Sequence, residues 1–513
     1  MLQIKNLTIT HKKDLRELIR NLSFTLNPGD KMAIIGEEGN GKSTLLKLIT
    51  DEKLTEDYAS YTGEIIKTGM RLGYLAQELT REQKAQTIYA FCCEQPGFWD
   101  LSPREIGDAA REVGLTEELL YADRPVSSLS GGERVKLQLA CLRMARPDAL
   151  LLDEPSNDID IETLEWLERF ILSSEAPVLF VSHDETLIEN TANRILHLEL
   201  VRKKTLPRAT VVRMPYRQYV AERLSSLERQ EQMARKEASE YRKQMERYRQ
   251  IYQRVEHEQN VISRQDPGGA RLLKKKMKAV KSMGRRFERE QEDRTQLPDV
   301  EEALLAGFEE NVSLPVGKTV LDFQLDALKV EDRILAQDIV LRVTGPEKVV
   351  IIGRNGAGKT TLLRRIAGEL LERQDVKAAY MPQNYEELCD RRLRPVEFLA
   401  PEGNKGAVTK ARTFLGSVKY TPEEMAHPIA ALSGGQKAKL LFIKMILDGC
   451  NVLVLDEPTR NFSPLSNPVI RRVLRCYGGA IISISHDRKY IGEVCDRELR
   501  LTPEGILPVE WEK

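Results

Sequence analysis

A glycine-rich loop that ends in a lysine and a hydroxyl residue occurs twice in this chain. The first copy reads GEEGNGKS and the second reads GRNGAGKT, so both fit the pattern G-x-x-x-x-G-K-S/T. Glycines at this spacing let backbone N–H groups turn inward at the start of a helix, where they can surround phosphate oxygens. We therefore expect the lysines to reach the β- and γ-phosphates of ATP and the hydroxyls to hold Mg²⁺. The residues predicted to bind the nucleotide in these loops are Gly36, Gly39, Gly41, Lys42, Ser43, Thr44, Gly353, Gly356, Gly358, Lys359, Thr360 and Thr361.

Two acidic residues follow a short apolar run in each half of the chain, as Asp153-Glu154 and Asp456-Glu457. We expect the first acid of each pair to contact Mg²⁺, directly or through water. The second acid is placed to polarise the attacking water as a general base, so Glu154 and Glu457 are predicted to be catalytic. The alternative is a solvated pair of acids at a strand end, but a proline and a turn follow both pairs in the same way.

A histidine and a glutamine complete each predicted site. His183 and His486 each stand in a Ser-His-Asp sequence after a further apolar run, where an imidazole can hydrogen-bond a γ-phosphate. We assign both histidines to catalysis, and Gln77 and Gln383 to contacts with water and Mg²⁺. The predicted metal ligands are Ser43, Thr360, Gln77, Gln383, Asp153 and Asp456.

These motifs recur in the same order in both halves, which identifies the chain as a duplication. The segment Met32–Ile49 returns as Val349–Ile366, and each copy places the glycine-rich loop between an apolar run and an amphipathic segment. The apolar runs are too short for helices and are typical of buried parallel strands. The predicted fold class is α/β, with two tandem P-loop ATPase domains joined by a long antiparallel helical hairpin. The predicted boundaries are 1–215 for the first domain, 216–297 for the hairpin and 298–513 for the second domain.

The segment between the two copies has its own periodicity. From Tyr216 to Asp266 it contains neither glycine nor proline, and its apolar or small residues recur at alternating spacings of four and three. This pattern predicts a helix roughly 70 Å long. The string DPGG at 266–269 is expected to break that helix, with a second helix restarting near Leu273 and a tip at 261–273. Gly284 lies on the second seam and marks either a kink or a close-packing point.

The string LSGG, at 129–132 and 432–435, predicts a second phosphate cradle, because a small hydroxyl and bare glycine amides stand at a helix start. On these residues the sequence resembles the ATP-binding-cassette superfamily, whose signature is LSGGQ; Gln436 completes it and Glu133 replaces the glutamine in the first half. The resemblance covers both halves and implies that the signature of one domain caps ATP bound to the other. Site one would join Lys42, Asp153, Glu154 and His183 to Ser433, Gly434 and Gly435. Site two would join Lys359, Asp456, Glu457 and His486 to Ser130, Gly131 and Gly132.

Both sites keep their acids and histidine, so two hydrolysis-competent sites are expected, but the two halves are not identical. Asp160 lies where the second copy has Ser463, within EPTRNFSP. The family usually carries aspartate at this position, and the loop communicates between the two paired domains. The serine in the second copy leaves open the alternative that the two sites hydrolyse ATP unequally. His11 is the candidate for stacking on adenine in the first half, and the second half offers none.

The sequence argues against a membrane-spanning or a secreted protein. No run of 18 or more apolar residues is present, and the first residues lack the basic-then-apolar pattern of a secretory signal. The seven cysteines form no CxxC pair and suit reduced thiols. We expect a soluble, cytoplasmic monomer with no membrane partner, in which the two domains pair within one chain.

Positive charge gathers on the predicted hairpin near its turn, although lysine plus arginine and aspartate plus glutamate both total 78 in the whole chain. From Gln259 to Phe287 there are nine lysines and arginines against one acid, Asp266. A concentrated basic tip favours a phosphate backbone through counterion release. The alternative is a solvated hairpin that only spaces the two domains.

Two cassettes, no membrane domain and an intervening helical hairpin resemble the ABC-F family, which acts on ribosomes. The lack of an added arm in the first cassette and the EPTRNFSP string resemble the branch that rescues ribosomes from antibiotics bound at the peptidyl-transferase centre. The resemblance implies entry into the tRNA exit site of the large subunit with ATP bound, contacts with rRNA and P-site tRNA, and release on hydrolysis. One alternative is a housekeeping factor that adjusts P-site tRNA. Another is a soluble ATPase subunit of a transporter, which gives the basic hairpin no role.

Overall fold

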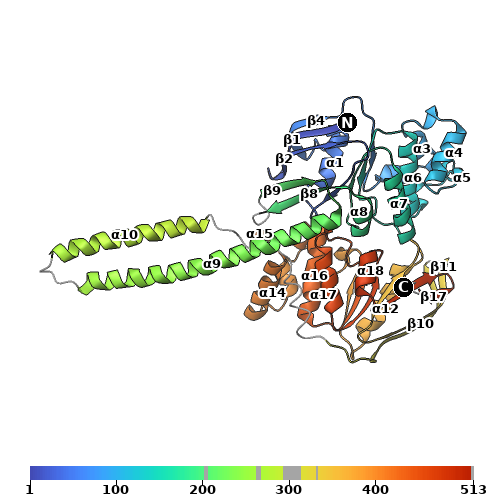
Figure 1. Cartoon of the computed structure of the whole chain (residues 1–513). Helices are drawn as coiled ribbons and strands as arrows, with labels where there is room; N and C mark the ends of the chain where they lie inside the picture. Colours follow the sequence, from blue (N-terminus) through green and yellow to red (C-terminus); the bar gives the residue numbers. More distant parts are fainter. Residues whose placement is uncertain (202–205, 262–266, 293–312, 331–332, 510–513) are drawn as a thin grey trace. The chain divides into compact units, whose positions relative to one another are not determined.

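The computed structural model describes residues 1–201, 206–261, 267–292, 313–330 and 333–509 (Figure 1). They form two compact units. One unit combines Met1–Tyr216 with the chain from Glu301 onward, and the other is Arg217–Val300. The predicted junction between hairpin and second domain, at 297 and 298, lies outside the described residues.

The first half of the larger unit is built on a six-stranded sheet in the order β5-β6-β7-β3-β8-β9. Neighbouring strands are parallel except β8 and β9. Every residue of β3, β6 and β7 is buried, as expected of parallel strands covered on both faces. A three-stranded antiparallel sheet, β2-β1-β4, lies beside it. The strands are β1 (Leu2–His11), β2 (Glu17–Leu26), β3 (Lys31–Ile35), β4 (Ala59–Ile66), β5 (Leu72–Leu75), β6 (Ala149–Asp153), β7 (Val178–Val181), β8 (Arg194–Val201) and β9 (Leu206–Val212).

The second half repeats this sheet with equivalent strands in the same order, β13-β14-β15-β12-β16-β17. Its antiparallel companion is the pair β10-β11. The shared order confirms the predicted duplication and the α/β class with two tandem domains. The strands are β10 (Thr319–Val330), β11 (Arg333–Thr344), β12 (Lys348–Ile352), β13 (Ala378–Met381), β14 (Val452–Asp456), β15 (Ala480–Ile484), β16 (Arg497–Thr502) and β17 (Gly505–Pro508).

Helices pack on these sheets and bury apolar residues against them. In the first half they are α1 (Lys42–Thr50), α2 (Arg81–Ala85), α3 (Ile88–Cys93), α4 (Pro103–Glu112), α5 (Glu117–Leu120), α6 (Gly131–Met144), α7 (Ile161–Ser173) and α8 (Glu185–Thr191). In the second half they are α12 (Lys359–Glu372), α13 (Pro395–Leu399), α14 (Lys405–Ser417), α15 (Pro422–Ala426), α16 (Gly434–Asp448), α17 (Asn467–Cys476) and α18 (Arg488–Val494). No helix in the described ranges has both the length and the apolar composition needed to cross a bilayer.

The smaller unit is the predicted helical hairpin, made of α9 (Tyr216–Val261) and α10 (Pro267–Glu292) (Figure 1). The prediction that the second helix restarts near Leu273 was wrong, because α10 already begins at Pro267. Proline is tolerated in the first turn of a helix, where its missing N–H would have no partner. Of the predicted tip, 262–266 lies outside the described residues and 267–273 is helical.

The two arms pack along the predicted seam. Val255 of α9 contacts Met277 and Val280 of α10, with two α9 tyrosines beside them. A Cβ built on Gly284 would lie 2.6 Å from the hydroxyl of Tyr248. Since α10 is continuous through this position, Gly284 is a close-packing point and not a kink.

The two halves of the larger unit meet through buried ion pairs. Arg471 of α17 binds Glu185 of α8 with two hydrogen bonds, of 2.7 Å from Nη1 and 3.3 Å from Nη2. Both side chains are only 3% exposed. Lys489 of α18 also reaches Glu185, at 3.0 Å, and Arg488 binds Glu168 of α7. The acids come from the first half and the bases from the second.

Replacing Arg471 by methionine is expected to lower the free energy of unfolding by about 3 kcal/mol, because the guanidinium partner of the buried Glu185 carboxylate is lost. The matched control is Arg354→Met. It breaks a pair with Glu162 whose side chains are 84% and 77% exposed, and it should change stability by no more than about 0.5 kcal/mol. Scanning calorimetry of both variants tests this, and equal melting-temperature shifts would contradict it.

Candidate active sites

Each glycine-rich loop connects a buried strand to a helix, as predicted: β3 leads to α1 and β12 leads to α12. The helices begin after Gly41 and Gly358, whose φ angles of 82° and 93° lie in the left-handed region that glycine adopts without strain. Gly36 is required for a different reason, since a Cβ there would lie 2.2 Å from the carbonyl oxygen of Leu198.

The two loop lysines are buried and bind their own loops. The Lys42 Nζ donates to the carbonyl oxygens of Gly36 at 2.9 Å and Glu37 at 3.1 Å. The Lys359 Nζ makes the equivalent bonds to Gly353 and Arg354, at 2.6 and 3.0 Å. Burial lowers the pKa of both lysines, while nearby carboxylates act in the opposite direction. A phosphate at this position would supply the anionic partner that burial makes favourable.

The predicted metal ligands fit a hard divalent cation. In site one the Ser43 hydroxyl donates to Asp153 Oδ1 at 2.9 Å, so the two predicted ligands adjoin. In site two both Oδ atoms of Asp456 are buried and make no hydrogen bond to the described residues. Burial raises the pKa of each aspartate, to about 6 for Asp153, and a bound cation would stabilise the carboxylates. Carboxylate and hydroxyl oxygens are the donors that Mg²⁺ prefers.

The two predicted catalytic acids share a strained backbone. Glu154 and Glu457 have φ angles of 51° and 52°, which non-glycine residues rarely adopt. Their N–H groups donate to Val181 and Ile484 on the neighbouring strand, at 3.1 and 2.9 Å. Such strain persists only where the surrounding structure enforces it, and it is concentrated at functional sites.

Site one pairs its acid with its histidine. The His183 Nε2 lies 3.0 Å from Glu154 Oε1, and the Glu154 side chain is 4% exposed. Burial acts to raise the pKa of Glu154, but His183, through its charge and hydrogen bond, and then Lys42 outweigh it, so the pKa is lowered. The other imidazole nitrogen of His183, Nδ1, lies 2.8 Å from the carbonyl oxygen of Phe462 in the second half.

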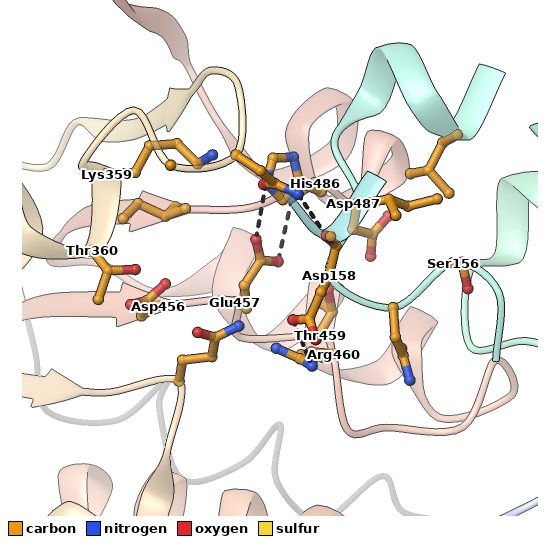
Figure 2. A pocket seen from close by; sticks show the side chains of 18 of the residues that line it. Ser156, Asp158, Lys359, Thr360, Asp456, Glu457, Thr459, Arg460, His486 and Asp487 are labelled. Atoms are coloured by element: carbon orange, nitrogen blue, oxygen red, sulfur yellow. Dashed lines mark hydrogen bonds and ion pairs between the residues drawn. The ribbon is translucent and has the colours of Figure 1, made fainter. Parts of the chain in front are cut away.

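Site two holds the same residue types differently (Figure 2). The His486 Nε2 lies 3.8 Å from Glu457 Oε1, and the closer contact is from the His486 backbone N–H to Oε2, at 3.3 Å. Burial, followed by the charge of Asp456, raises the pKa of Glu457 to about 8. Burial, followed by Lys359, lowers the pKa of His486 to about 4. The two sites therefore differ in the electrostatics of their acids.

Each site contains residues from both halves. The site-two pocket is lined by the second loop and by Gly131 of the first signature. At site one the backbone N–H of Gly435 donates to Glu38 Oε2 of the first loop, at 3.0 Å. Gln77 lines the site-one pocket and Gln383 the site-two pocket, as do the two threonines after the loop hydroxyls.

The signature serines cap their own helices. Ser130 accepts a hydrogen bond from the N–H of Glu133, whose carboxylate binds the Ser130 N–H at 2.8 Å. Ser433 and Gln436 form the equivalent capping box on α16. Of the predicted signature residues, Gly131 lines a pocket in the described part of the chain, whereas Ser130, Gly132, Ser433, Gly434 and Gly435 are in the lining of neither pocket.

Sequence reasoning missed two residues at which the two sites meet. Asn157 and Arg460 line both pockets, as does the predicted His183, and Arg460 binds Asp158 across the halves with an N–O distance of 2.9 Å (Figure 2). The sequence did contain a signal for them, because Asn157 and Arg460 occupy the same position in the two repeats. His11, the candidate for stacking on adenine, lines the site-one pocket together with Tyr58, which sequence reasoning did not identify.

Comparisons with known proteins agree with this architecture. The family model described as "ABC transporter" matches residues 19–157 and 336–460, just over half of the chain. ATP-binding protein Uup of Escherichia coli is 28% identical, covering 92% of this chain and 76% of its own. ABC transporter F family member 2 of Arabidopsis thaliana is 25% identical, covering 96% of this chain and 75% of its own.

Among solved structures, the archaeal ribosome recycling factor aABCE1, in complex with the ribosomal stalk protein aP1, has a similar fold. It has a TM-score of 0.61 and 16% identity, covering 98% of this chain and 90% of its own. Family match, repeated sheet order and paired phosphate loops agree: the chain belongs to the ATP-binding-cassette family and is an ATPase with two tandem cassettes that bind ATP.

Proposed function

We propose that ATP binds in two composite sites, each formed by the glycine-rich loop of one cassette and the signature of the other. The observation that carries this is the contact between Glu38 and Gly435, which joins a phosphate loop to the opposite signature. Site one comprises Lys42, Asp153, Glu154, His183, Ser433 and Gly435, and site two comprises Lys359, Asp456, Glu457, His486, Ser130 and Gly132.

The acids and histidines divide the work of hydrolysis. Glu154 and Glu457 orient the attacking water and accept its proton, and His183 and His486 contact the γ-phosphate. Ser43 with Asp153, and Thr360 with Asp456, would hold Mg²⁺, with Gln77 and Gln383 nearby. A bound Mg²⁺ would supply neutralisation of the developing phosphate charge. Closure of the cassettes brings the signature amides onto the γ-phosphate.

We further propose that the chain is an ABC-F protein that acts on the ribosome in the cytoplasm through its hairpin. On α10, Leu273, Met277 and Val280 are buried in the seam, whereas Lys274, Lys275 and Lys276 between them are exposed. The packing of one face thus exposes the three lysines to solvent, where they can contact RNA phosphates, and Lys276 also lies 4.0 Å from a carboxylate oxygen of Glu258. A related fold occurs in a protein described as an archaeal ribosome recycling factor, which favours a ribosomal role.

The specific role we propose is protection of the ribosome from antibiotics at the peptidyl-transferase centre. The ATP-bound protein enters the tRNA exit site of the large subunit, contacts rRNA and P-site tRNA, and leaves on hydrolysis. Between β5 and α6 the first cassette has helices of only 4 to 10 residues, which favours a chain without an added arm. Drug susceptibility of a sensitive host carrying the gene tests this: unchanged susceptibility with ATP-dependent ribosome binding would instead support a housekeeping factor.

Changing Glu154 and Glu457 to glutamine together is expected to slow ATP hydrolysis by at least about 100-fold, because glutamine keeps the side-chain size but accepts no proton from water. ATP should stay bound, and the protein should remain on ribosomes in sedimentation assays. The double variant Glu118→Gln with Glu402→Gln removes two exposed acids away from both sites and should behave as wild type. Normal hydrolysis in the first variant would refute the assignment of the catalytic acids.

Changing Ser130 and Ser433 to tyrosine together is expected to lower hydrolysis at least about tenfold, because a bulky ring at each helix start would exclude the opposite γ-phosphate. Threonine at both positions keeps the capping hydroxyl and should retain most activity. Steady-state phosphate release measures both variants. If tyrosine and threonine gave equal rates, the sites would not be shared between cassettes.

Reversing Lys274, Lys275 and Lys276 to glutamate is expected to weaken ribosome binding at raised salt by roughly tenfold or more, because up to three phosphate contacts are lost. Basal ATPase should be largely intact. The control reverses Arg242, Lys243 and Arg247, three exposed bases in the middle of α9. Cosedimentation across a salt series measures both, and equal losses would show that the α10 lysines have no special part in binding.

A further inference from the structure

The first glycine-rich loop carries two acids, Glu37 and Glu38, where the second carries Arg354 and Asn355. The Glu38 side chain reaches the other cassette, where Oε2 accepts a hydrogen bond of 3.0 Å from the Gly435 N–H. A Cβ built on Gly434 would lie 3.3 Å from the same oxygen. A carboxylate therefore rests against the first turn of α16, a helix of 15 residues.

This is the place at which the proposed shared site puts the γ-phosphate. N–H groups in the first turn of a helix carry partial positive charge and bind anions. Glu38 also lines the site-one pocket, together with Lys42 of the same loop. One side chain thus contacts the opposite signature helix and lines the pocket to which the proposed function assigns the phosphates.

Site two is built differently at the equivalent residue. The Asn355 Nδ2 donates a hydrogen bond of 2.5 Å to the carbonyl oxygen of Asp158, in the loop after β6. Asn355 carries no charge, and the loop from Gly353 to Thr360 contains no acid. Any effect of the Glu38 contact therefore belongs to site one alone.

We infer that Glu38 is an autoinhibitory residue of site one, whose carboxylate occupies the signature amides of the second cassette until the γ-phosphate of ATP displaces it. The inference rests on the proposed sharing of sites. Glu38 is exposed to solvent, so its side chain can turn away without disrupting the core. ATP must displace the carboxylate, whereas ADP, which lacks a γ-phosphate, leaves the contact in place. Site two, free of this competition, fills with ATP before site one.

The test compares nucleotide affinities of Glu38→Gln and Glu37→Gln in the full chain. Both variants remove one negative charge from the same loop. The Glu37 carboxylate, however, lies 4.0 Å from the Lys419 ammonium and makes no contact with the signature amides. The Lys359→Ala change, added to every protein, confines the measurement to site one. Fluorescence titrations with a non-hydrolysable ATP analogue and with ADP give the two dissociation constants.

The loss of one negative charge should by itself raise the affinity for the ATP analogue and the affinity for ADP by a similar factor, in either variant. Glu38→Gln is expected to raise the affinity for the ATP analogue by roughly a further three- to tenfold, with no further gain for ADP. This is roughly the difference between a hydrogen bond to a charged acceptor and one to a neutral acceptor. Equal effects of the two variants, or a loss of ATP-analogue affinity in Glu38→Gln, would overturn the inference.

A reciprocal variant keeps the test independent of the first. Asn355→Glu, in a chain that also carries Lys42→Ala, places the carboxylate in site two and should weaken the ATP analogue there relative to ADP. An unchanged ratio of the two affinities would count against the inference. Failure of the shared-site proposal would look different: the tyrosine variants at Ser130 and Ser433 would then hydrolyse ATP normally, whatever the result at Glu38.

Discussion

The face-to-face pairing of the two cassettes is the constraint on which both ATP sites depend. In the proposed shared sites, a phosphate loop forms one side of each site and the opposite signature helix forms the other. In this chain the pairing is reinforced by Arg471 and Glu185, which are 286 residues apart in sequence and almost completely buried together. Burying two charges is costly unless they are paired with good geometry, so such contacts favour the one arrangement in which they meet.

The polarity of that interface also distinguishes the two halves. The acids of α7 and α8 face the bases of α17 and α18, so equivalent helices have diverged into complementary partners. Two copies of the same half would bring like charges together, which is unfavourable at short range. The duplication therefore produces two similar cassettes that pair through unlike surfaces, so the two ATP sites can also differ.

They do differ, although the residue types of the acid and histidine are the same. Glu154 is paired with His183 at 3.0 Å and its pKa is lowered, whereas Glu457 lies further from the His486 ring and burial raises its pKa. The phosphate loops differ as well, with acids in one and an arginine and an asparagine in the other. The loop exchange of Asp160 for Ser463 is thus one of several asymmetries, and Arg460, in contact with Asp158, is another.

The duplication, the α/β class, the phosphate loops and the hairpin seam could all be predicted from the amino-acid sequence, because each depends on short motifs or on periodicity along one element. Sequence reasoning misplaced the start of α10, since proline is read as a helix breaker although it fits the first helical turn. Three contacts became visible in the folded chain and not before: Gly284 accommodates Tyr248, Arg471 binds Glu185, and Glu38 reaches Gly435. These contacts join residues from different elements, and their distances depend on how the elements pack, which no local pattern in the chain encodes.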